Sequence, residues 1–251
     1  MSETAALLTV AVPSFNQGVF LEAALSSIFA QNLPVEVFVL DGGSTDHTLE
    51  VIQRWAPRLA GWRSHADAGQ AAAINEGIAA GRAPYVCWLN SDDYYLADGL
   101  ASLLDALRAA PQAAFAYGDT EMVDVAGKFL RRYPTRPFSR FWFRRYCFIS
   151  QPATLMRRSA WEAVGGLDAS LQLALDYDLW WRLLTQGEAL YRPVRVAADR
   201  QHGATKTNTR RREHYREAMM VLRRHTGGVP LKWYLFWPYA VWWRSWSARR
   251  A

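Results

Sequence analysis

The stretch Tyr85-Val86-Cys87-Trp88-Leu89-Asn90-Ser91-Asp92-Asp93 joins a short apolar run to two adjacent carboxylates. The apolar run predicts a buried strand, and the apolar spacing from Ala97 to Ala110 predicts a helix after it. Ligands of open α/β sheets bind at the carboxyl ends of the strands. We therefore expect Asp92 and Asp93 to face a ligand, and adjacent carboxylates can hold a hard divalent cation that bridges nucleotide phosphates. The alternative is that this Asp pair only caps the following helix.

Strands and helices alternate along the first half of the chain. Strands are expected at residues 7–12, 35–40, 62–64, 85–89 and 113–117, and helices at residues 19–31, 70–81 and 97–110. A further helix, capped by Ser44 or Thr45, is expected to end near Trp55. This alternation favours an α/β fold with a Rossmann-like, mainly parallel sheet and helices on both faces. The turn at residues 13–18 has one glycine instead of a G-x-G-x-x-G fingerprint, which disfavours a dinucleotide-dependent dehydrogenase.

The second half of the chain is less regular. The expected elements are a hairpin at 123–130 with Gly127 in its turn, an extended segment at 151–156, helices at 160–164, from 176 and at 210–225, and a strand at 194–198. No repeat or low-complexity linker interrupts them. With 251 residues, we expect one α/β domain over residues 1–226 and an aromatic and basic tail over residues 227–251.

Basic residues outnumber acidic ones, 29 to 23, and the sequence pI is about 9.5. The excess is uneven, because no Asp or Glu lies between Val125 and Trp161 or after Glu217. This charge indicates an anionic partner, such as a nucleotide phosphate or an acidic lipid. A nucleic-acid partner is not expected, because no recognised nucleic-acid-binding motif accompanies the basic residues.

Cysteine use and the N-terminus bear on location. Cys87 and Cys147 are the only cysteines, and their spacing fits neither a zinc site nor a redox pair, which favours a reducing cytoplasm. The segment from Met1 to Thr4 lacks the basic start and apolar run of a secretory signal. No apolar segment of roughly 18 residues is present to span a bilayer. We expect a cytoplasmic protein that does not cross the membrane.

The segment from Val229 to Trp246 is rich in tryptophan. Its five tryptophans are Trp233, Trp237, Trp242, Trp243 and Trp246. Lys232 and Arg244 stand among them, and such a mixture suits the headgroup zone of an anionic membrane. We expect peripheral binding at the inner face of the cell membrane. The alternative is a helix packed onto the domain.

Five short motifs occur in one order along the chain. They are Val12-Pro13-Ser14-Phe15-Asn16, Asp41-Gly42-Gly43-Ser44-Thr45-Asp46, Asp67-Ala68-Gly69-Gln70 with Asn75, Asn90-Ser91-Asp92-Asp93, and Asp176-Tyr177-Asp178-Leu179-Trp180. Over residues 7–205 the chain resembles a family 2 glycosyltransferase of the GT-A fold. The resemblance implies inverting transfer of a sugar from a nucleoside-diphosphate donor, usually a UDP-sugar, with Mn²⁺ or Mg²⁺. It also implies a glycan or lipid-linked acceptor in cell-surface polysaccharide synthesis.

The same resemblance implies roles for individual residues. Asp93 corresponds to the metal ligand and Asp92 to a ribose-binding or metal-linked acid, and His202 can join the metal site. The residues implied in donor binding are Pro13, Ser14, Asn16, Asp41, Asp67, Gln70, Asn75, Asp92 and Lys206. The chain departs from the family at Asp41-Gly42, where many members have two consecutive acids, and this departure leaves the base of the nucleotide open.

A carboxylate must also take the proton of the attacking acceptor hydroxyl. Asp176 matches the family position for this general base, and Asp178 is the alternative. Both could instead serve only the first turn of a helix, where the helix dipole favours acids.

Two other classes of protein compete with this interpretation. A sugar-nucleotide pyrophosphorylase would need a glycine-rich, basic phosphate loop after the first strand, and residues 13–18 do not provide one. A non-catalytic nucleotide-sugar-binding or scaffold protein of the same fold is the second. Retention of Asp92, Asp93 and Asp176 argues against it.

Overall fold

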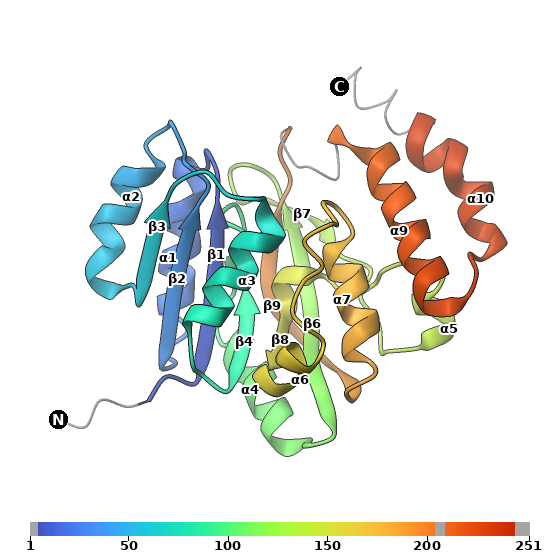
Figure 1. Ribbon diagram of the computed structural model, residues 1–251, viewed down its shortest axis with the longest axis horizontal. Coiled ribbons are helices and arrows are strands. Elements are labelled where there is room, and N and C mark those ends of the chain that lie inside the picture. The colour runs from blue at the N-terminus through green and yellow to red at the C-terminus, as the bar shows by residue number, and fades with distance from the viewer. Residues whose placement is uncertain (1–4, 204–208, 244–251) are drawn as a thin grey trace.

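A computed structural model describes residues 5–203 and 209–243, and Figure 1 shows one twisted sheet flanked by helices. The strands are β1 (Leu8–Ser14), β2 (Val35–Asp41), β3 (Gly61–Ser64), β4 (Tyr85–Trp88), β5 (Tyr94–Tyr95), β6 (Ala113–Val123), β7 (Phe129–Arg132), β8 (Thr154–Arg157) and β9 (Glu188–Arg200). The helices are α1 (Gly18–Phe29), α2 (Thr48–Trp55), α3 (Gln70–Ala80), α4 (Gly99–Ala109), α5 (Arg140–Phe143), α6 (Arg158–Ala163), α7 (Leu175–Leu183), α9 (Arg211–Thr226) and α10 (Leu231–Trp237). Short 3₁₀ turns span Ala56–Arg58 and Gln151–Ala153, and a π-helix spans Pro238–Trp243.

The strand order is β3-β2-β1-β4-β8-β6-β9-β5, and β7 pairs with β6. The first four strands are parallel, as are β6 and β9. The intervening strand β8 runs antiparallel to both of its neighbours. The predicted α/β sheet with a parallel core is thus confirmed, and the carboxyl ends of β1, β2 and β4 meet at one edge.

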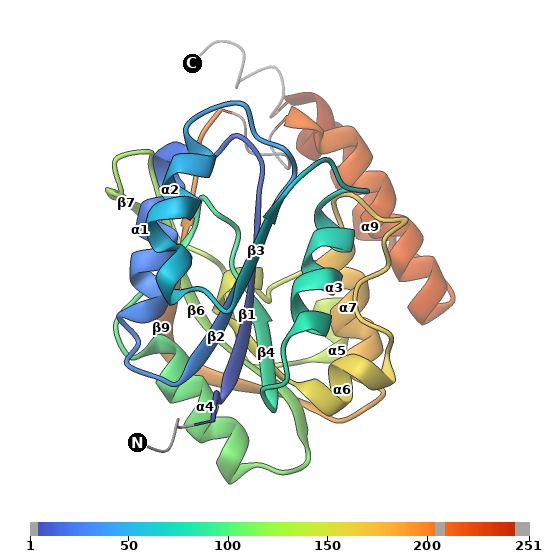
Figure 2. The same cartoon turned by 60° about the vertical axis from the view of Figure 1, so that its left-hand side comes forward.

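Two apolar layers cover the sheet, one on each face. Alternate residues of β1 enter opposite layers: Val10 packs with Leu25 of α1, and Ala11 packs with Ile74 of α3. Helices α1, α2 and α4 lie on one side, and α3, α6 and α7 lie on the other (Figure 2). Burial of both faces explains why these strands are continuously apolar in sequence.

Two sequence expectations need correction, and the alternative role of the Asp pair as a helix cap is excluded. Neither Ser44 nor Thr45 caps α2: the Asp46 carboxylate accepts the Thr48 N–H, and the Ser44 hydroxyl donates to Asp41. Asp92 and Asp93 precede a short strand and do not cap α4, because the residue at the N-terminal cap position is Asp98. Strands β6 and β9 extend well beyond the predicted 113–117 and 194–198, because they pair with each other almost throughout.

The C-terminal elements pack on the side of the domain opposite β3 (Figure 1). Trp233 is buried and donates its indole N–H to the Arg144 carbonyl at 2.9 Å, and its own carbonyl accepts the Tyr215 hydroxyl at 2.9 Å. The inner face of the tail thus packs on the domain. Residues 244–251 and the side chains of Trp242 and Trp243 lie outside the described part of the chain. Among the helices that the structure describes, none combines the length and apolar character needed to cross a membrane.

Gly99 gives a test of the packing between α4 and β9. A β-carbon at this position would lie 2.6 Å from the Val196 carbonyl oxygen and 2.7 Å from the Val196 Cα. Backbone cannot yield as a side chain does, so we expect Gly99→Ala to lower the free energy of unfolding by about 1–3 kcal/mol. Urea denaturation measures this change. Gly228→Ala, where no atom lies near the added methyl, is the matched control, and equal stability of the two variants would contradict the packing.

Candidate functional site

Asp93 is buried directly beyond β4. Its Oδ1 accepts the Arg200 N–H at 3.0 Å, and its Oδ2 accepts the Asn90 side-chain amide at 3.3 Å. Burial raises the pKa of Asp93 well above its usual value, and the carboxylates of Asp92 and Asp199 raise it further. The carboxylate therefore ties the end of β4 to the end of β9.

Asp92 lies beside His202, with 2.9 Å between Asp92 Oδ2 and His202 Nε2. Asp199 belongs to the same cluster: burial, with the nearby Asp92 carboxylate, raises its pKa to about 6. Sequence reasoning missed Asp199, although it lies at the end of a predicted strand, as Asp92 does. The strand ends thus bring the carboxyl groups of Asp92, Asp93 and Asp199 together.

The donor set near Asp92 suits a divalent cation. A carboxylate oxygen and an imidazole nitrogen are ligands that Mn²⁺ accepts, and Mg²⁺ is commonly held by one or two carboxylates plus substrate phosphates. Within residues 5–203 and 209–243, no three His, Cys, Asp or Glu side chains are arranged to hold an ion by themselves. The Asp92–His202 pair fits a metal whose remaining ligands come from a diphosphate.

A chain of amide side chains orders the loop beneath these acids. Gln70, at the start of α3, donates to the Asn90 side-chain oxygen at 2.8 Å. Asn90 donates to Gln151 at 3.2 Å, and Gln151 donates to the Trp88 carbonyl at 2.8 Å. Gln70, expected in donor binding, is thus placed at the site edge, and Gln151 is a partner that its sequence context did not reveal.

Asp41 is buried and has several hydrogen-bond donors. Its carboxylate accepts the N–H groups of Gly43 and Ser44 and the hydroxyls of Ser44 and Ser64. The carboxylate thus shapes the loop after β2. The donor-binding role that the resemblance implies for Asp41 stays a prediction.

The segments after β1 and β2 expose an aromatic side chain to solvent beside the Asp41 loop. The side chain of Phe15 is exposed, and a β-carbon on Gly42 would lie 3.3 Å from its ring and 3.7 Å from Asp67 Oδ2. Asp67 is paired with Arg63 at 3.0 Å. The ends of β1 and β2 therefore bring together Phe15, the Gly42 backbone and Asp67. Phe15 is a candidate donor-binding residue that the sequence analysis did not single out.

The other expected donor-binding residues divide into two groups. Pro13 and Ser14 end the buried strand β1, and the Asn16 side chain accepts the Thr45 N–H at 2.8 Å, so these residues border the same loops. Asn75 instead exchanges two 2.9 Å hydrogen bonds with the backbone of Leu167. Its amide fastens the chain after α6 to α3, which does not support the implied donor contact. Lys206 lies outside the described residues.

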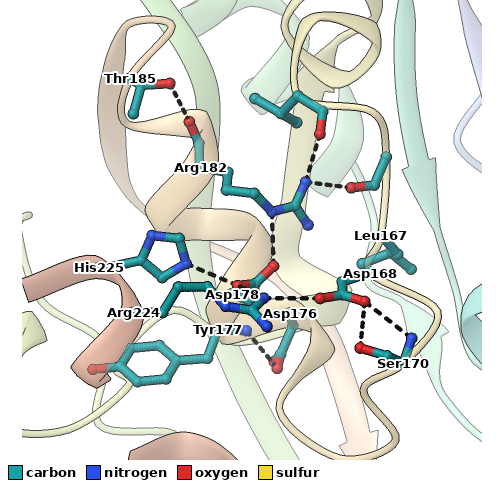
Figure 3. Close-up of polar contacts among 12 residues, drawn as sticks. Leu167, Asp168, Ser170, Asp176, Tyr177, Asp178, Arg182, Thr185, Arg224 and His225 are labelled. Carbon is teal, nitrogen blue, oxygen red and sulfur yellow. Dashed lines mark hydrogen bonds and ion pairs between the residues drawn. The ribbon is translucent and has the colours of Figure 1, made fainter. Parts of the chain in front are cut away.

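Asp176 and Asp178 occupy the first turn of α7 but point in different directions (Figure 3). Asp176 accepts the Tyr177 N–H at 2.7 Å. Burial raises the pKa of Asp176 to about 6. A carboxylate with such a pKa is suited to accept a proton near neutral pH.

Asp178 is fully buried in a network of ion pairs. Its oxygens lie 2.7 Å from Arg182 Nε, 2.8 Å from His225 Nε2 and 3.2 Å from Arg224 Nη1. Burial alone would raise the pKa of Asp178, but the hydrogen bonds from His225 and Arg182 hold it below the usual value. This carboxylate joins α7 to α9, and its geometry disfavours the alternative in which Asp178 is the base.

Glu217 of α9 orders the segment just before Asp176. Its carboxylate accepts the N–H groups of Gln172, Leu173 and Ala174 at 2.8 to 3.3 Å. Ala174 is the residue before α7, so a carboxylate from another helix caps this N-terminus. Glu217 is therefore a positioning residue for Asp176, and no local sequence pattern indicated it.

The sequence profile of glycosyl transferase family 2 matches residues 9–165, which is more than half of the chain. The chain belongs to this family. The family predicted from the five motifs is thereby confirmed.

Relatives of this family 2 member include proteins of different lengths. A glycosyltransferase of Rickettsia typhi, described as uncharacterized, is 24% identical over 219 residues, which cover 81% of this chain and 66% of the relative. The PGL/p-HBAD biosynthesis glycosyltransferase of Mycobacterium bovis is 28% identical over 180 residues, 69% of this chain and 68% of the relative. Escherichia coli chondroitin synthase is 25% identical over 185 residues, 72% of this chain but only 27% of the synthase.

Solved structures share the fold. S. aureus TarS 1-349 in complex with UDP-GlcNAc superposes with a TM-score of 0.65 at 16% identity, over 87% of this chain and 67% of that one. The mannosyltransferase PcManGT from Pyrobaculum calidifontis, in complex with GDP-Man and Mn²⁺, superposes with a TM-score of 0.64 at 21% identity. The match covers 99% of this chain and 74% of that one. The GT-A fold implied by the resemblance is thus confirmed.

The capping role of Glu217 predicts a local effect of Glu217→Gln. Loss of the negative charge weakens acceptance of three backbone N–H groups, so the free energy of unfolding should fall by about 1–2 kcal/mol. Amide exchange of Leu173 and Ala174 should accelerate more than that of the sheet. Glu213→Gln, on the same helix but exposed, is the control. Unchanged exchange before α7 would rule out the cap.

The raised pKa of Asp176 predicts that Asp176→Asn stabilises the protein near neutral pH, whereas Glu217→Gln destabilises it. A carboxyl whose folded pKa is about 6, against an ordinary 3.8, holds its proton more tightly when folded, so its ionisation costs stability as the pH rises through this range. The Asn variant should be more stable than the wild type by on the order of 1–3 kcal/mol near neutral pH, and the gain should shrink toward about pH 4.

Asp168→Asn is the control for this measurement. Hydrogen bonds from Ser170 and Arg224 lower the pKa of Asp168 to about 2, so its loss should destabilise the protein at neutral pH. Urea unfolding at several pH values compares the variants. A neutral-pH loss of stability in Asp176→Asn would contradict the raised pKa.

Proposed function

We propose that the chain is an inverting glycosyltransferase that moves a sugar from a nucleoside-diphosphate donor to a glycan or lipid-linked acceptor. The observation that carries this proposal is a buried, proton-accepting Asp176 together with the Asp92–His202 pair at the strand ends. Burial raises the pKa of Tyr133, and the nearby Cys147 and the carboxylates of Asp176 and Asp199 raise it further. Tyr133 is thus within electrostatic reach of both parts of the site.

The chemistry assigns each group a task. The Asp176 carboxylate takes the proton of the acceptor hydroxyl. At the same time the oxygen of that hydroxyl attacks the anomeric carbon from the face opposite the diphosphate. Asp92 and His202 would hold a divalent cation, which would stabilise the charge that develops on the departing diphosphate. Asp93, the implied metal ligand, has both oxygens on protein donors. We assign it to holding the Arg200 backbone, and with it the loop that carries His202.

The donor is proposed to be a nucleotide sugar, with a UDP-sugar as the first candidate. Structures of the same fold have been solved with UDP-GlcNAc and with GDP-Man and Mn²⁺, so both bases are compatible with the fold. The exposed Phe15 ring beside Gly42 offers a surface on which a base can stack. Asp41 contributes by shaping this loop rather than by reading the base.

The acceptor and location rest on the relatives and on the tail. The relatives named chondroitin synthase and PGL/p-HBAD biosynthesis glycosyltransferase support a role in polysaccharide synthesis. We propose a cytoplasmic protein that binds the inner face of the membrane peripherally. No nucleic-acid partner is proposed.

The test is a screen of nucleotide sugars for donor hydrolysis by the full chain, with Mn²⁺, with Mg²⁺ and with a chelator. We expect metal-dependent release of nucleoside diphosphate, with a rate that rises with pH through about 6 because Asp176 must be ionised. Asp176→Asn should lower turnover by about 100-fold or more and leave donor affinity nearly unchanged. Asp92→Asn should weaken metal-dependent binding of the donor.

Asp105→Asn, an exposed change on α4, is the matched control and should behave as the wild type. Metal-dependent donor binding without hydrolysis or transfer under any condition would support the non-catalytic binding protein instead. Near-normal turnover in Asp176→Asn would refute the assignment of the base.

A further inference from the structure

The outer face of α10 is apolar and exposed. Leu231 and Leu235 are 70% and 69% exposed, and Tyr234, Phe236 and Tyr239 are about half exposed. Residues 231, 234 and 235 share one face of a helix, while Trp233 points inward and is buried. The packing that fixes the tail on the domain thus leaves a second apolar stripe without a partner in the described structure.

Helix α5 extends this stripe. Its residues Phe141 and Trp142 are exposed, and α5 adjoins α10 because the buried Trp233 indole donates to the Arg144 carbonyl. The Lys232 ammonium lies 5.4 Å from the Tyr146 ring and 5.2 Å from the Phe236 ring, so it joins α10 to the segment that follows α5. We name as the α5–α10 surface the residues Phe141, Trp142, Leu231, Tyr234, Leu235, Phe236 and Tyr239.

Arginine side chains contact the aromatic rings of this surface. The Arg145 guanidinium lies 3.5 Å from the centroid of the Phe141 ring, and that of Arg136 lies 4.6 Å from Trp142. Arg223 donates to the Tyr234 hydroxyl at 3.1 Å. No Asp or Glu occurs between residues 125 and 161 or after residue 217, the two segments that build the surface.

Aromatic rings beside cations match the headgroup zone of an anionic bilayer. Aromatic side chains with polar tips favour that zone, and basic residues beside it gain from the negative surface potential. We propose that the α5–α10 surface docks the protein on an anionic lipid membrane. Charge complementarity selects this occupant over a second copy of the chain, because two copies would bring these cations together.

The position of the surface also specifies the acceptor. The Tyr177 hydroxyl donates to the Phe143 carbonyl at 2.5 Å, and the two rings lie 5.0 Å apart, so α5 packs on the residue next to Asp176. A membrane on the α5–α10 surface would therefore lie beside the proposed base. We therefore infer that the acceptor hydroxyl belongs to a lipid-linked molecule held in that membrane. This inference rests on the proposed function.

The test is co-sedimentation of the full chain with vesicles of phosphatidylcholine alone or with about one quarter phosphatidylglycerol. We expect binding to the anionic vesicles that weakens at high salt. The double variant Leu231→Glu, Leu235→Glu should bind about tenfold more weakly or worse, and Lys232→Gln should bind about fivefold more weakly. Val19→Glu, on α1 and 68% exposed, is the matched control and should bind as the wild type.

Three outcomes would overturn the proposal. The first is that the wild type does not bind anionic vesicles, and the second is that the wild type and the double variant bind them equally. The third is that the wild type is a dimer, the double variant is a monomer, and neither binds vesicles. Donor hydrolysis in solution keeps the two proposals apart, because the double variant should retain it. Vesicle binding by a chain that hydrolyses no donor would defeat only the proposed function.

Discussion

One buried hydrogen bond, from the Arg200 N–H to the Asp93 carboxylate, joins the first half of the sheet to its last long strand. Strands β4 and β9 are not neighbours in the sheet, but Tyr94 and Tyr95, directly after Asp93, pair with Ala198 and Ala197 of β9, and the Asp93 hydrogen bond secures the same junction. With Asp93 in place, Asp92, Asp199 and His202 converge although they come from distant parts of the chain. The cost is a carboxylate held in a poorly solvated position, which its raised pKa records.

The number of hydrogen-bond donors around each acid separates structural from reactive carboxylates. Asp41 and Asp178 are both buried, and each has several donors that satisfy its charge. Asp176 accepts backbone N–H groups of its own first turn, including that of Tyr177, but burial outweighs them and keeps its pKa at about 6. All three acids belong to family motifs, but their capacity to accept a proton depends on their three-dimensional surroundings.

Sequence patterns predicted what depends on local spacing. Continuous apolar runs located β1 and β4, and Gly227 in a left-handed conformation ends α9 near the predicted boundary. The lengths of β6 and β9 could not be predicted, because polar residues such as Asp119 in β6 and Arg192 in β9 interrupt the apolar pattern outside the predicted bounds. The contacts of Asn75, Gln151 and Glu217 were also hidden, since each partner lies tens of residues away and no periodicity encodes it.

The matched family profile ends at residue 165, whereas Asp176, Glu217 and the tail all follow it. Helices α7 and α9 are bound to each other through Asp178 and through the Glu217 cap, so these two helices depend on each other structurally. Recombination between relatives should therefore succeed when α7 to α10 are exchanged together. A junction between α7 and α9 would separate Asp176 from the helix that holds the start of α7.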